Sequence, residues 1–222
     1  MLCEEKFSEI YGKDPSGISF SPYRICPIGA HSDHNLGKIT GFAINKGIHI
    51  AYKPKHNGVV EMSSLKFPKR AQWHIREIGG KTGDWADYLR GATWALENRY
   101  PLTTGVSGVI EGSLPIGGLS SSAAVILAFL EALCEVNGIH LEPQELIDTA
   151  FDAEKNYVGV NVGTLDQSCE VLSKKDHLLY LDCKDNHYEL IPTDPAMKPY
   201  QIAVFFSGLE HSLAGSKYNM RV

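Results

Sequence analysis

The pattern of apolar and polar positions near the N-terminus predicts one helix followed by two strands. Residues 3–12 form an acidic, amphipathic segment of helical character, closed by a glycine and the turn-forming run Asp14-Pro15-Ser16-Gly17. Apolar and polar residues alternate over 18–25, and residues 39–52 are rich in types that favour strands. The loop between these two strands covers residues 29–37 and carries several polar side chains.

The central part of the chain is expected to mix short strands with longer helices. Apolar residues fall at helical intervals from Trp85 to Leu96, and this helix should end before Tyr100-Pro101. An apolar run over 121–137 predicts a second helix, and Glu142-Pro143 opens a third that runs to about residue 157. Short strands are expected at residues 59–62, 72–78 and 105–111.

The last part of the chain predicts a loop and two more strands. Asp166 follows a glycine and is expected to lie in a loop. Residues 177–183 and 201–206 are apolar runs of strand length, separated by a proline-containing connection over 191–199. Strands and helices mixed without a regular β-α-β rhythm favour an α+β sandwich over a doubly wound sheet.

Composition narrows the class of protein and its compartment. The chain has 222 residues, of which 43% are hydrophobic, so it can bury one substantial core and begin a second. Its net charge of -5, with no basic cluster longer than Lys53-Pro54-Lys55, argues against a nucleic-acid or anionic-membrane binder. Five scattered cysteines without a C-x-x-C pair favour a reducing compartment. Because the N-terminus is acidic and no apolar run approaches transmembrane length, we expect a cytoplasmic protein.

A glycine- and serine-rich stretch is the first candidate for chemistry. Pro115-Ile116-Gly117-Gly118-Leu119-Ser120-Ser121-Ser122-Ala123 connects a predicted strand to a predicted helix, and we call it the phosphate-binding stretch. Adjacent glycines let the backbone approach a ligand, and serines can cap a helix whose first N–H groups attract anions. No Gly-Lys-Ser/Thr follows, so it is not a Walker P-loop. From these residues alone, a capped turn and a phosphate cradle both remain open.

Four stretches resemble motifs of one family. Residues 115–124 resemble the phosphate-binding motif of the GHMP kinases, which include galactokinases, homoserine kinases, mevalonate kinases and phosphomevalonate kinases. Pro22-Tyr23-Arg24-Ile25-Cys26-Pro27-Ile28-Gly29-Ala30-His31-Ser32-Asp33-His34-Asn35 is similar to the N-terminal sugar signature of the galactokinase branch. Gly163-Thr164-Leu165-Asp166-Gln167 and residues 211–221 also resemble segments of that branch.

The resemblance implies a fold, a domain division and a reaction. Residues 1–190 would form a GHMP kinase N-terminal domain, an α+β fold similar to domain 2 of ribosomal protein S5. Residues 191–222 would be a linker and the first elements of a C-terminal domain, since the sequence ends where a galactokinase is about half complete. The implied reaction is ATP- and Mg²⁺-dependent phosphorylation of the anomeric hydroxyl of galactose or a related sugar.

The resemblance also implies roles for individual residues. Asp166 corresponds to the general base that faces the C1 hydroxyl of the sugar, and Arg24 to the arginine near the transferred phosphoryl group. The residues that would hold ATP are Pro115, Gly117, Gly118, Leu119, Ser120, Ser121, Ser122 and Ala123. From the residues alone, an Asx-turn or helix cap at Asp166 and a surface salt bridge at Arg24 remain alternatives.

A magnesium site is expected at Ser122 and Glu154. A hard divalent cation prefers oxygen ligands and keeps several waters, so one hydroxyl, one carboxylate and the nucleotide phosphates would suffice. The resemblance implies this role for Glu154, which lies twelve residues before Asp166. The alternative for Glu154 is a solvated residue late in a helix.

The expected sugar contacts come from several loops. They are His31, Asp33, Gly163 and Tyr218, because hydroxyl recognition needs short polar groups that converge near the backbone. The run His31-Ser32-Asp33-His34 could also suggest a zinc site, but no third ligand follows at a suitable spacing.

Two departures from the galactokinase pattern concern the C6 end of the sugar. Galactokinases usually carry Glu at the position of Ala30 and Tyr at that of His34. The Glu hydrogen-bonds the C6 hydroxyl and would repel a C6 carboxylate, so Ala30 removes a repulsion and leaves room. The signature is also similar to that of the galacturonate kinase branch, and His34 could add a donor. We therefore expect galacturonate as acceptor, with neutral drift or a water-mediated galactose contact as the alternative.

A second class of function remains open from the sequence. A galactokinase-like chain that lacks half of the fold can be a sugar- or nucleotide-binding sensor without turnover, or one piece of a longer enzyme. Retention of Asp166, Arg24 and the three serines favours catalysis. If the apolar residues after position 200 lack their packing partners, we expect an exposed face that promotes self-association.

Overall fold

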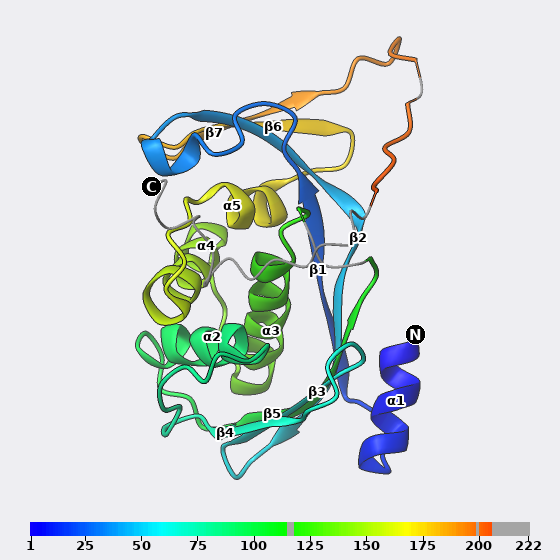
Figure 1. Cartoon of the computed structure of the whole chain (residues 1–222), viewed down its shortest axis with the longest axis vertical. Helices are drawn as coiled ribbons and strands as arrows, with labels where there is room; N and C mark the ends of the chain where they lie inside the picture. Colours follow the sequence, from blue (N-terminus) through cyan, green and yellow to red (C-terminus); the bar gives the residue numbers. More distant parts are fainter. Residues whose placement is uncertain (115–117, 199, 206–222) are drawn as a thin grey trace.

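The core of the molecule is a mainly antiparallel sheet. The computed structural model describes residues 1–114, 118–198 and 200–205 (Figure 1). In these ranges the strand order is β4-β3-β5-β2-β6-β7, with β1 paired to β2, and only the β3–β5 pair is parallel. The strands are β1 (Gly17–Ile25), β2 (Lys38–Lys55), β3 (Val59–Ser64), β4 (Ala71–His74), β5 (Gly105–Gly112), β6 (His177–Asp182) and β7 (His187–Pro192).

Most helices cover one side of this sheet. They are α1 (Leu2–Tyr11), α2 (Asp87–Glu97), α3 (Ser121–Asn137), α4 (Pro143–Asp152) and α5 (Leu165–Leu172), with a 3-10 turn η1 (Asp33–Asn35) and a π-helical segment η2 (Ala153–Val158). Figure 1 shows α2 to α5 on one side of the sheet and α1 on the other. This arrangement confirms the predicted α+β class.

The long strand β2 connects the two buried surfaces of the sheet. Ile50 and Tyr52 belong to the main core together with α3, whereas Ala51 packs with Phe7 of α1 on the opposite face. This alternation follows from the period of two along a strand. The first part of β2 pairs with β6 and the last part with β5, so one strand links the main core to the smaller cluster around α5.

Helix α3 is the central helix of the fold. Its side chains are apolar on most of the circumference, which is typical of a helix enclosed by other elements. Gly138, with φ of 65°, ends it in the left-handed conformation that favours glycine. Its N-terminus receives the chain directly from the phosphate-binding stretch. None of the described helices, α3 included, is both long and apolar enough to cross a membrane.

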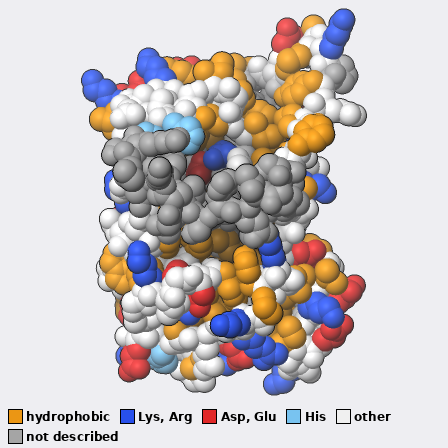
Figure 2. All heavy atoms as spheres, in the orientation of Figure 1, with side chains coloured by type: hydrophobic (Ala, Val, Ile, Leu, Met, Phe, Trp, Pro, Cys, Tyr) orange, Lys and Arg blue, Asp and Glu red, His pale blue; other side chains and the backbone are white. Residues whose placement is uncertain are grey.

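The segment after β7 presents apolar side chains to the surface. Side chains exposed by 43% or more on β7 and the following segment are Tyr188, Ile191, Met197, Tyr200, Ile202, Val204 and Phe205. Figure 2 shows hydrophobic side chains gathered at the upper right, where Figure 1 places this segment. Residues 201–205 form no strand, contrary to prediction, because no described strand pairs with them; Phe206 lies outside the described residues.

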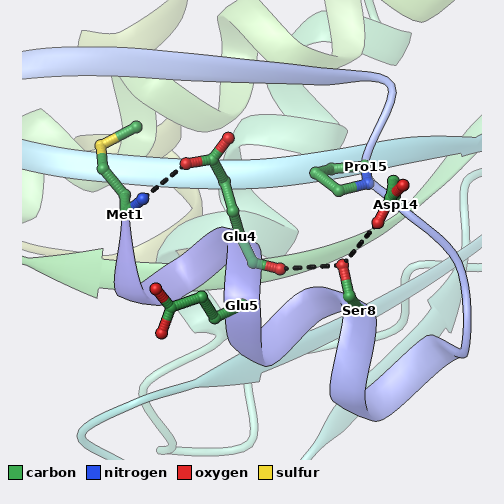
Figure 3. A pocket seen from close by; sticks show the side chains of 6 residues that line it. All are labelled: Met1, Glu4, Glu5, Ser8, Asp14 and Pro15. Atoms are coloured by element: carbon green, nitrogen blue, oxygen red, sulfur yellow. Dashed lines mark hydrogen bonds and ion pairs between the residues drawn. The ribbon is translucent and has the colours of Figure 1, made fainter.

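A shallow acidic hollow lies beside α1, away from α3 to α5 (Figure 3). Glu4, Glu5 and Asp14 line it, and Ser8 donates a hydrogen bond to Asp14 at 3.0 Å. The amino group of Met1 is paired with Glu4 at 2.6 Å. The amino group of Met1 therefore neutralises part of the negative charge of the hollow. The hollow lies on the face of the sheet opposite the candidate site.

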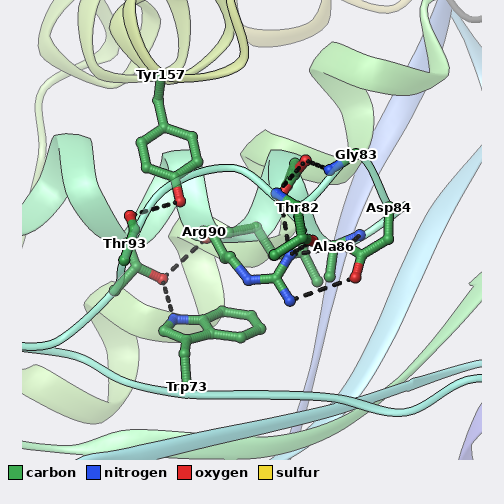
Figure 4. A network of polar contacts seen from close by, with 11 residues as sticks. Trp73, Thr82, Gly83, Asp84, Ala86, Arg90, Thr93 and Tyr157 are labelled. Carbon is green, nitrogen blue, oxygen red and sulfur yellow. Dashed lines mark hydrogen bonds and ion pairs between the residues drawn. The ribbon is translucent and has the colours of Figure 1, made fainter.

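A buried polar network fixes the start of α2 (Figure 4). Asp87 accepts a hydrogen bond from the backbone N–H of Thr82 at 2.9 Å and pairs with Arg90 at 2.8 Å. Arg90 also pairs with Asp84 at 2.8 Å, and its guanidinium lies 5.4 Å from the centre of the Trp73 ring. Asp87, in the first turn of α2, therefore ties the start of this helix to the segment that precedes it.

Some element boundaries differ from the sequence prediction. Trp85 precedes α2 and does not lead it, since the helix begins at Asp87. Strand β4 ends at His74, where the chain turns and His74 bridges to Glu77, so the predicted strand over 72–78 is shorter. Strand β7 occupies part of the predicted connection. Its side chains are mostly exposed, so it lacks the apolar pattern that would have revealed it.

Candidate active site

The centre of the candidate site is an ion pair between β1 and α5. Nε and Nη2 of Arg24 each lie 2.7 Å from Oδ1 of Asp166, and the two side chains are 14% and 20% exposed. Burial lowers the pKa of Arg24, but the charge of Asp166 and its hydrogen bond outweigh this and raise that pKa above its ordinary value. The pair is therefore charged and largely enclosed, unlike a surface salt bridge.

Asp166 lies in a helix, which corrects the prediction of a loop. It is in the first turn of α5, whose N-cap is Thr164, so Asp166 is not the cap either. The segment is short, and its glycine-led start concealed its helical character in the sequence. A carboxylate in a first turn is stabilised by the positive end of the helix dipole. The helix also fixes the direction of the side chain toward Arg24.

Arg24 holds the phosphate-binding stretch as well. Its Nη1 donates to the carbonyl oxygen of Gly118 at 3.0 Å, and its backbone N–H donates to that of Leu119 at 3.3 Å. Gly118 has a φ of 70°, and a Cβ there would meet nothing within 4 Å. The glycine therefore serves the backbone conformation and does not make space. One residue of β1 thus ties the phosphate-binding stretch to the ion pair.

The side chain of Ser120 does not cap α3, although the sequence left a serine cap open at this turn. It occupies the N-cap position but makes no side-chain capping bond with described residues, since its φ of 65° is left-handed and not the extended conformation of ordinary caps. Ser121 and Ser122 are half-buried in the first turn, and Leu119 and Ala123 are buried. The first N–H groups of α3 therefore have no cap from Ser120. Pro115 and Gly117 lie outside the described residues.

Glu154 is fully buried, so it is not the solvated residue that the sequence left open as an alternative. It lies in η2, where Nε2 of Gln167 donates to its Oε2 at 2.8 Å, while Oε1 has no hydrogen-bond partner in the described parts of the chain. Burial and the negative charge of Asp166 raise the pKa of Glu154 to about 7, although the Ser122 hydroxyl and Gln167 act in the opposite direction.

Ser122 and Glu154 fit the expected magnesium site. The hydroxyl of Ser122 neighbours the carboxylate of Glu154, one oxygen of which lacks a partner. A hard divalent cation prefers such oxygens and takes its remaining ligands from water and phosphate. Among the described residues no group of three or more His, Cys, Asp or Glu could hold a metal ion, so a cation here would depend on nucleotide phosphates.

Asp33 and Gly163, two of the residues predicted to contact the sugar, lie against each other. Asp33 is 8% exposed, and its Oδ2 accepts a hydrogen bond from the backbone N–H of Leu165 at 3.3 Å. A Cβ at Gly163 would lie 2.3 Å from that same oxygen. Only glycine therefore allows the carboxylate to lie against this backbone.

The other predicted sugar contacts lie in the loop between β1 and β2. Ala30 and His31 are exposed there, and Nδ1 of His34 lies 3.5 Å from Oδ1 of Asp33. The rings of His31 and His34 are 6.4 Å apart. No zinc-binding cluster occurs among the described residues. Tyr218 lies outside them.

Two buried residues of α5, Gln167 and Glu170, were not among the predicted site residues. Gln167 contacts Glu154, and Glu170 lies close to the ion pair. Glu170 follows Asp166 by four residues, which places both on one face of a helix. This spacing becomes a signal only once the segment is known to be helical.

Comparison with known proteins defines the class. Residues 87–174 match the family described as GHMP kinases N terminal domain, and residues 5–54 match the galactokinase galactose-binding signature. The first range includes the phosphate-binding stretch and Asp166, and the second includes Arg24 and Asp33. A crystal structure of Methanococcus jannaschii mevalonate kinase, with a TM-score of 0.65 and 20% identity over 79% of this chain and 55% of that one, shares the fold.

More similar relatives lie within one branch of this class. The galacturonokinase of Arabidopsis thaliana is 36% identical over 99% of this chain and 57% of its own length. The galactokinase of Chloroflexus aurantiacus is 33% identical, over 97% of this chain and 55% of its own. The crystal structure of Lactococcus lactis galactokinase complexed with galactose has a TM-score of 0.89 and 31% identity, over 98% of this chain and 57% of that one.

The chain belongs to the galactokinase family of the GHMP kinases, as the resemblance of its motifs predicted. It spans about half the length of the curated relatives it matches.

Proposed function

We propose that this protein serves an ATP-dependent sugar 1-kinase reaction, in which the γ-phosphoryl group of ATP passes to the anomeric hydroxyl of a galactose-related sugar. The observation that carries the proposal is the double contact of Arg24, which pairs with Asp166 and also binds the carbonyl of Gly118. Phosphoryl transfer depends mainly on positioning and charge neutralisation. Arg24 contacts both the residue proposed to face the acceptor hydroxyl, Asp166, and the stretch proposed to bind the phosphates.

Asp166 is the residue for the acceptor hydroxyl. Its carboxylate would take the proton of the C1 hydroxyl as the sugar oxygen bonds to the γ-phosphorus and the bond to ADP breaks. Arg24 would neutralise charge on the phosphoryl group while it keeps Asp166 aligned. Gly163 and Asp33, in contact with each other and close to Asp166 in the chain, would bind sugar hydroxyls together with His31 and Tyr218.

The phosphate-binding stretch is the proposed binding site for the phosphates of ATP. The first N–H groups of α3, with Gly118, Leu119 and the three serines, would surround the phosphates, and Pro115, Gly117 and Ala123 complete the stretch. Ser122 and Glu154 would hold Mg²⁺. When bound, Mg²⁺ neutralises the negative charge of the phosphates.

Ala30 supports galacturonate as the acceptor. It lies in the exposed part of the loop between β1 and β2, and His34 lies beside Asp33 in the same loop. A small side chain at this position presents no like charge to a C6 carboxylate. The similarity to a galacturonokinase at 36% identity is in keeping with this proposal.

The test of the acceptor is a comparison of hexoses and uronic acids with ATP, followed by ADP release. We expect a higher kcat/KM for galacturonate than for galactose, and we expect Ala30→Glu to shift the preference toward galactose about tenfold or more, since it restores a like charge. Ala196→Glu, at an exposed position after β7, is the matched control and should leave the preference unchanged. Efficient use of galactose with no activity on galacturonate would contradict the acceptor while leaving the kinase proposal intact.

A sugar- or nucleotide-binding role without turnover is the second candidate. Binding of ATP and sugar without ADP release would support this candidate over the kinase.

A further inference from the structure

Glu170 is a buried acid that the proposed reaction does not use. It lies on α5, four residues after Asp166, and is 7% exposed. Neither of its carboxyl oxygens has a hydrogen-bond partner among the described residues. A buried polar group without a partner costs on the order of 1–3 kcal/mol, so its presence here calls for a physical reason.

No cation neutralises Glu170 in the described part of the chain. The groups that act on it are the charge of Asp166, the hydroxyl of Ser120 and the charges of Arg24 and Glu154, while Tyr23 is its neighbour on β1. Arg24 directs Nε and Nη2 to Asp166 and Nη1 to Gly118. Burial and the negative charge of Asp166 raise the pKa of Glu170 well above its ordinary value, although the Ser120 hydroxyl and the charge of Arg24 act in the opposite direction. Burial of a carboxyl group without a hydrogen-bonded cation favours the neutral acid.

A neutral carboxylic acid has one O–H donor, and an acceptor is at hand. Oγ of Ser120 is buried, has no partner among the described residues, and neighbours the carboxyl group of Glu170. We propose that Glu170 is a positioning residue of the phosphate-binding stretch, which donates a hydrogen bond from its carboxylic O–H to Oγ of Ser120. This inference rests on the proposed function, because the stretch it positions is the one proposed to hold ATP.

With this bond, three consecutive residues of the phosphate-binding stretch would each be held by a hydrogen bond from β1 or α5. The Arg24 side chain holds Gly118, the Arg24 backbone holds Leu119, and Glu170 would hold Ser120. Ser120 needs such a partner, since a φ of 65° is unfavourable by about 1 kcal/mol or more for a residue with a Cβ. Three consecutive residues at the entrance to α3 would thus be fixed relative to the ion pair.

The test is the affinity of the chain for ATP and Mg²⁺, measured by calorimetric titration. Glu170→Leu removes the donor at similar volume and should weaken ATP binding about tenfold, the worth of one hydrogen bond. Glu170→Gln keeps a donor and should stay within about twofold of the wild type. Ser120→Ala should weaken binding as much as Glu170→Leu, and the double variant should be no weaker than either single variant. Glu135→Gln, an exposed acid of α3, is the control.

Equal losses in Glu170→Gln and Glu170→Leu, or additive losses in the double variant, would overturn the proposal. If the wild type binds no nucleotide, the proposed function fails for this chain, yet two readouts still decide the role of Glu170. The first is the infrared absorption of protonated carboxylic acids, measured in a Glu154→Gln background so that Glu154, with its pKa of about 7, does not contribute; it should decrease when Glu170→Gln is added. The second is non-additivity of Glu170→Leu and Ser120→Ala in the free energy of unfolding. No decrease in that absorption, or additive effects on unfolding, refutes the bond.

Discussion

Three consecutive residues at the start of α5 organise the candidate site. The backbone N–H of Leu165 donates to Asp33, Asp166 pairs with Arg24, and Gln167 donates to Glu154. The first contact holds the loop between β1 and β2. The second holds Arg24, which binds the phosphate-binding stretch, and the third holds the proposed magnesium ligand Glu154. A small displacement of α5 would therefore disturb all three at once.

The pKa of Glu154 gives a prediction for pH dependence. Its value of about 7 in the folded chain lies above the ordinary glutamate pKa of 4.5, so the folded state binds the proton more tightly than the unfolded state. Stability of the wild type relative to Glu154→Gln should therefore be greatest below pH 4.5 and fall as pH rises to about 7, by about 3 kcal/mol in total without Mg²⁺. Urea unfolding across this range measures the difference. A difference that stays constant with pH would show that the pKa of Glu154 is the same in the folded and unfolded states.

At the scale of elements, the entrance to α3 depends on left-handed backbone at Gly118 and Ser120. Gly118→Ala should destabilise the chain by about 1 kcal/mol, because a Cβ is disfavoured at a φ of 70° even though space is open there. It should also weaken ATP binding, since the stretch would change shape. Gly80→Ala is the matched control, with open space and no positive φ. Thermal unfolding of both variants tests this, and equal effects would contradict the backbone argument.

The elements also show how far the sequence alone could lead. The boundaries of α3 and β5 were predictable because a continuous apolar run and strand-forming residues mark them. The helical start of α5 was not, since eight residues give too few turns for a clear period. Contacts such as that of Arg24 with Asp166 join residues 142 positions apart, and only the fold brings them together. The resemblance of motifs pointed to this pair, whereas Glu170 had no such signal.

At the scale of the whole molecule, the segment after β7 exposes large apolar side chains close together in the sequence. Phe205 is 88% exposed and Tyr200 63%, values that are unfavourable for large apolar side chains clustered together. We propose that residues 191–222 begin a second domain, as expected from the domain division at residue 190. The N-terminal elements up to β6 contain four hydrophobic clusters of buried residues among the described ones, so they have buried cores of their own.

This surface should cause self-association of the 222-residue chain. Sedimentation velocity over a range of concentrations should show an apparent mass that rises with concentration. The double change Tyr200→Ser and Phe205→Ser should reduce this rise, because it removes the two most exposed apolar side chains of the segment. Ile18→Ser, on β1, is a control at a less exposed site. A monomer at every concentration would show that the exposed side chains do not pair between copies.

The measurement that bears most directly on the central claim is phosphorus NMR of the products formed from ATP, Mg²⁺ and galacturonate. Long incubation at high protein concentration makes even slow turnover measurable. The wild type should yield a sugar phosphorylated at the anomeric oxygen. Asp166→Asn, which removes the base with little change in volume, should lower the rate about 10²- to 10⁴-fold while sugar binding persists. A wild type that binds ATP and sugar but forms no sugar phosphate, or an Asp166→Asn variant within a few-fold of it, would contradict the account.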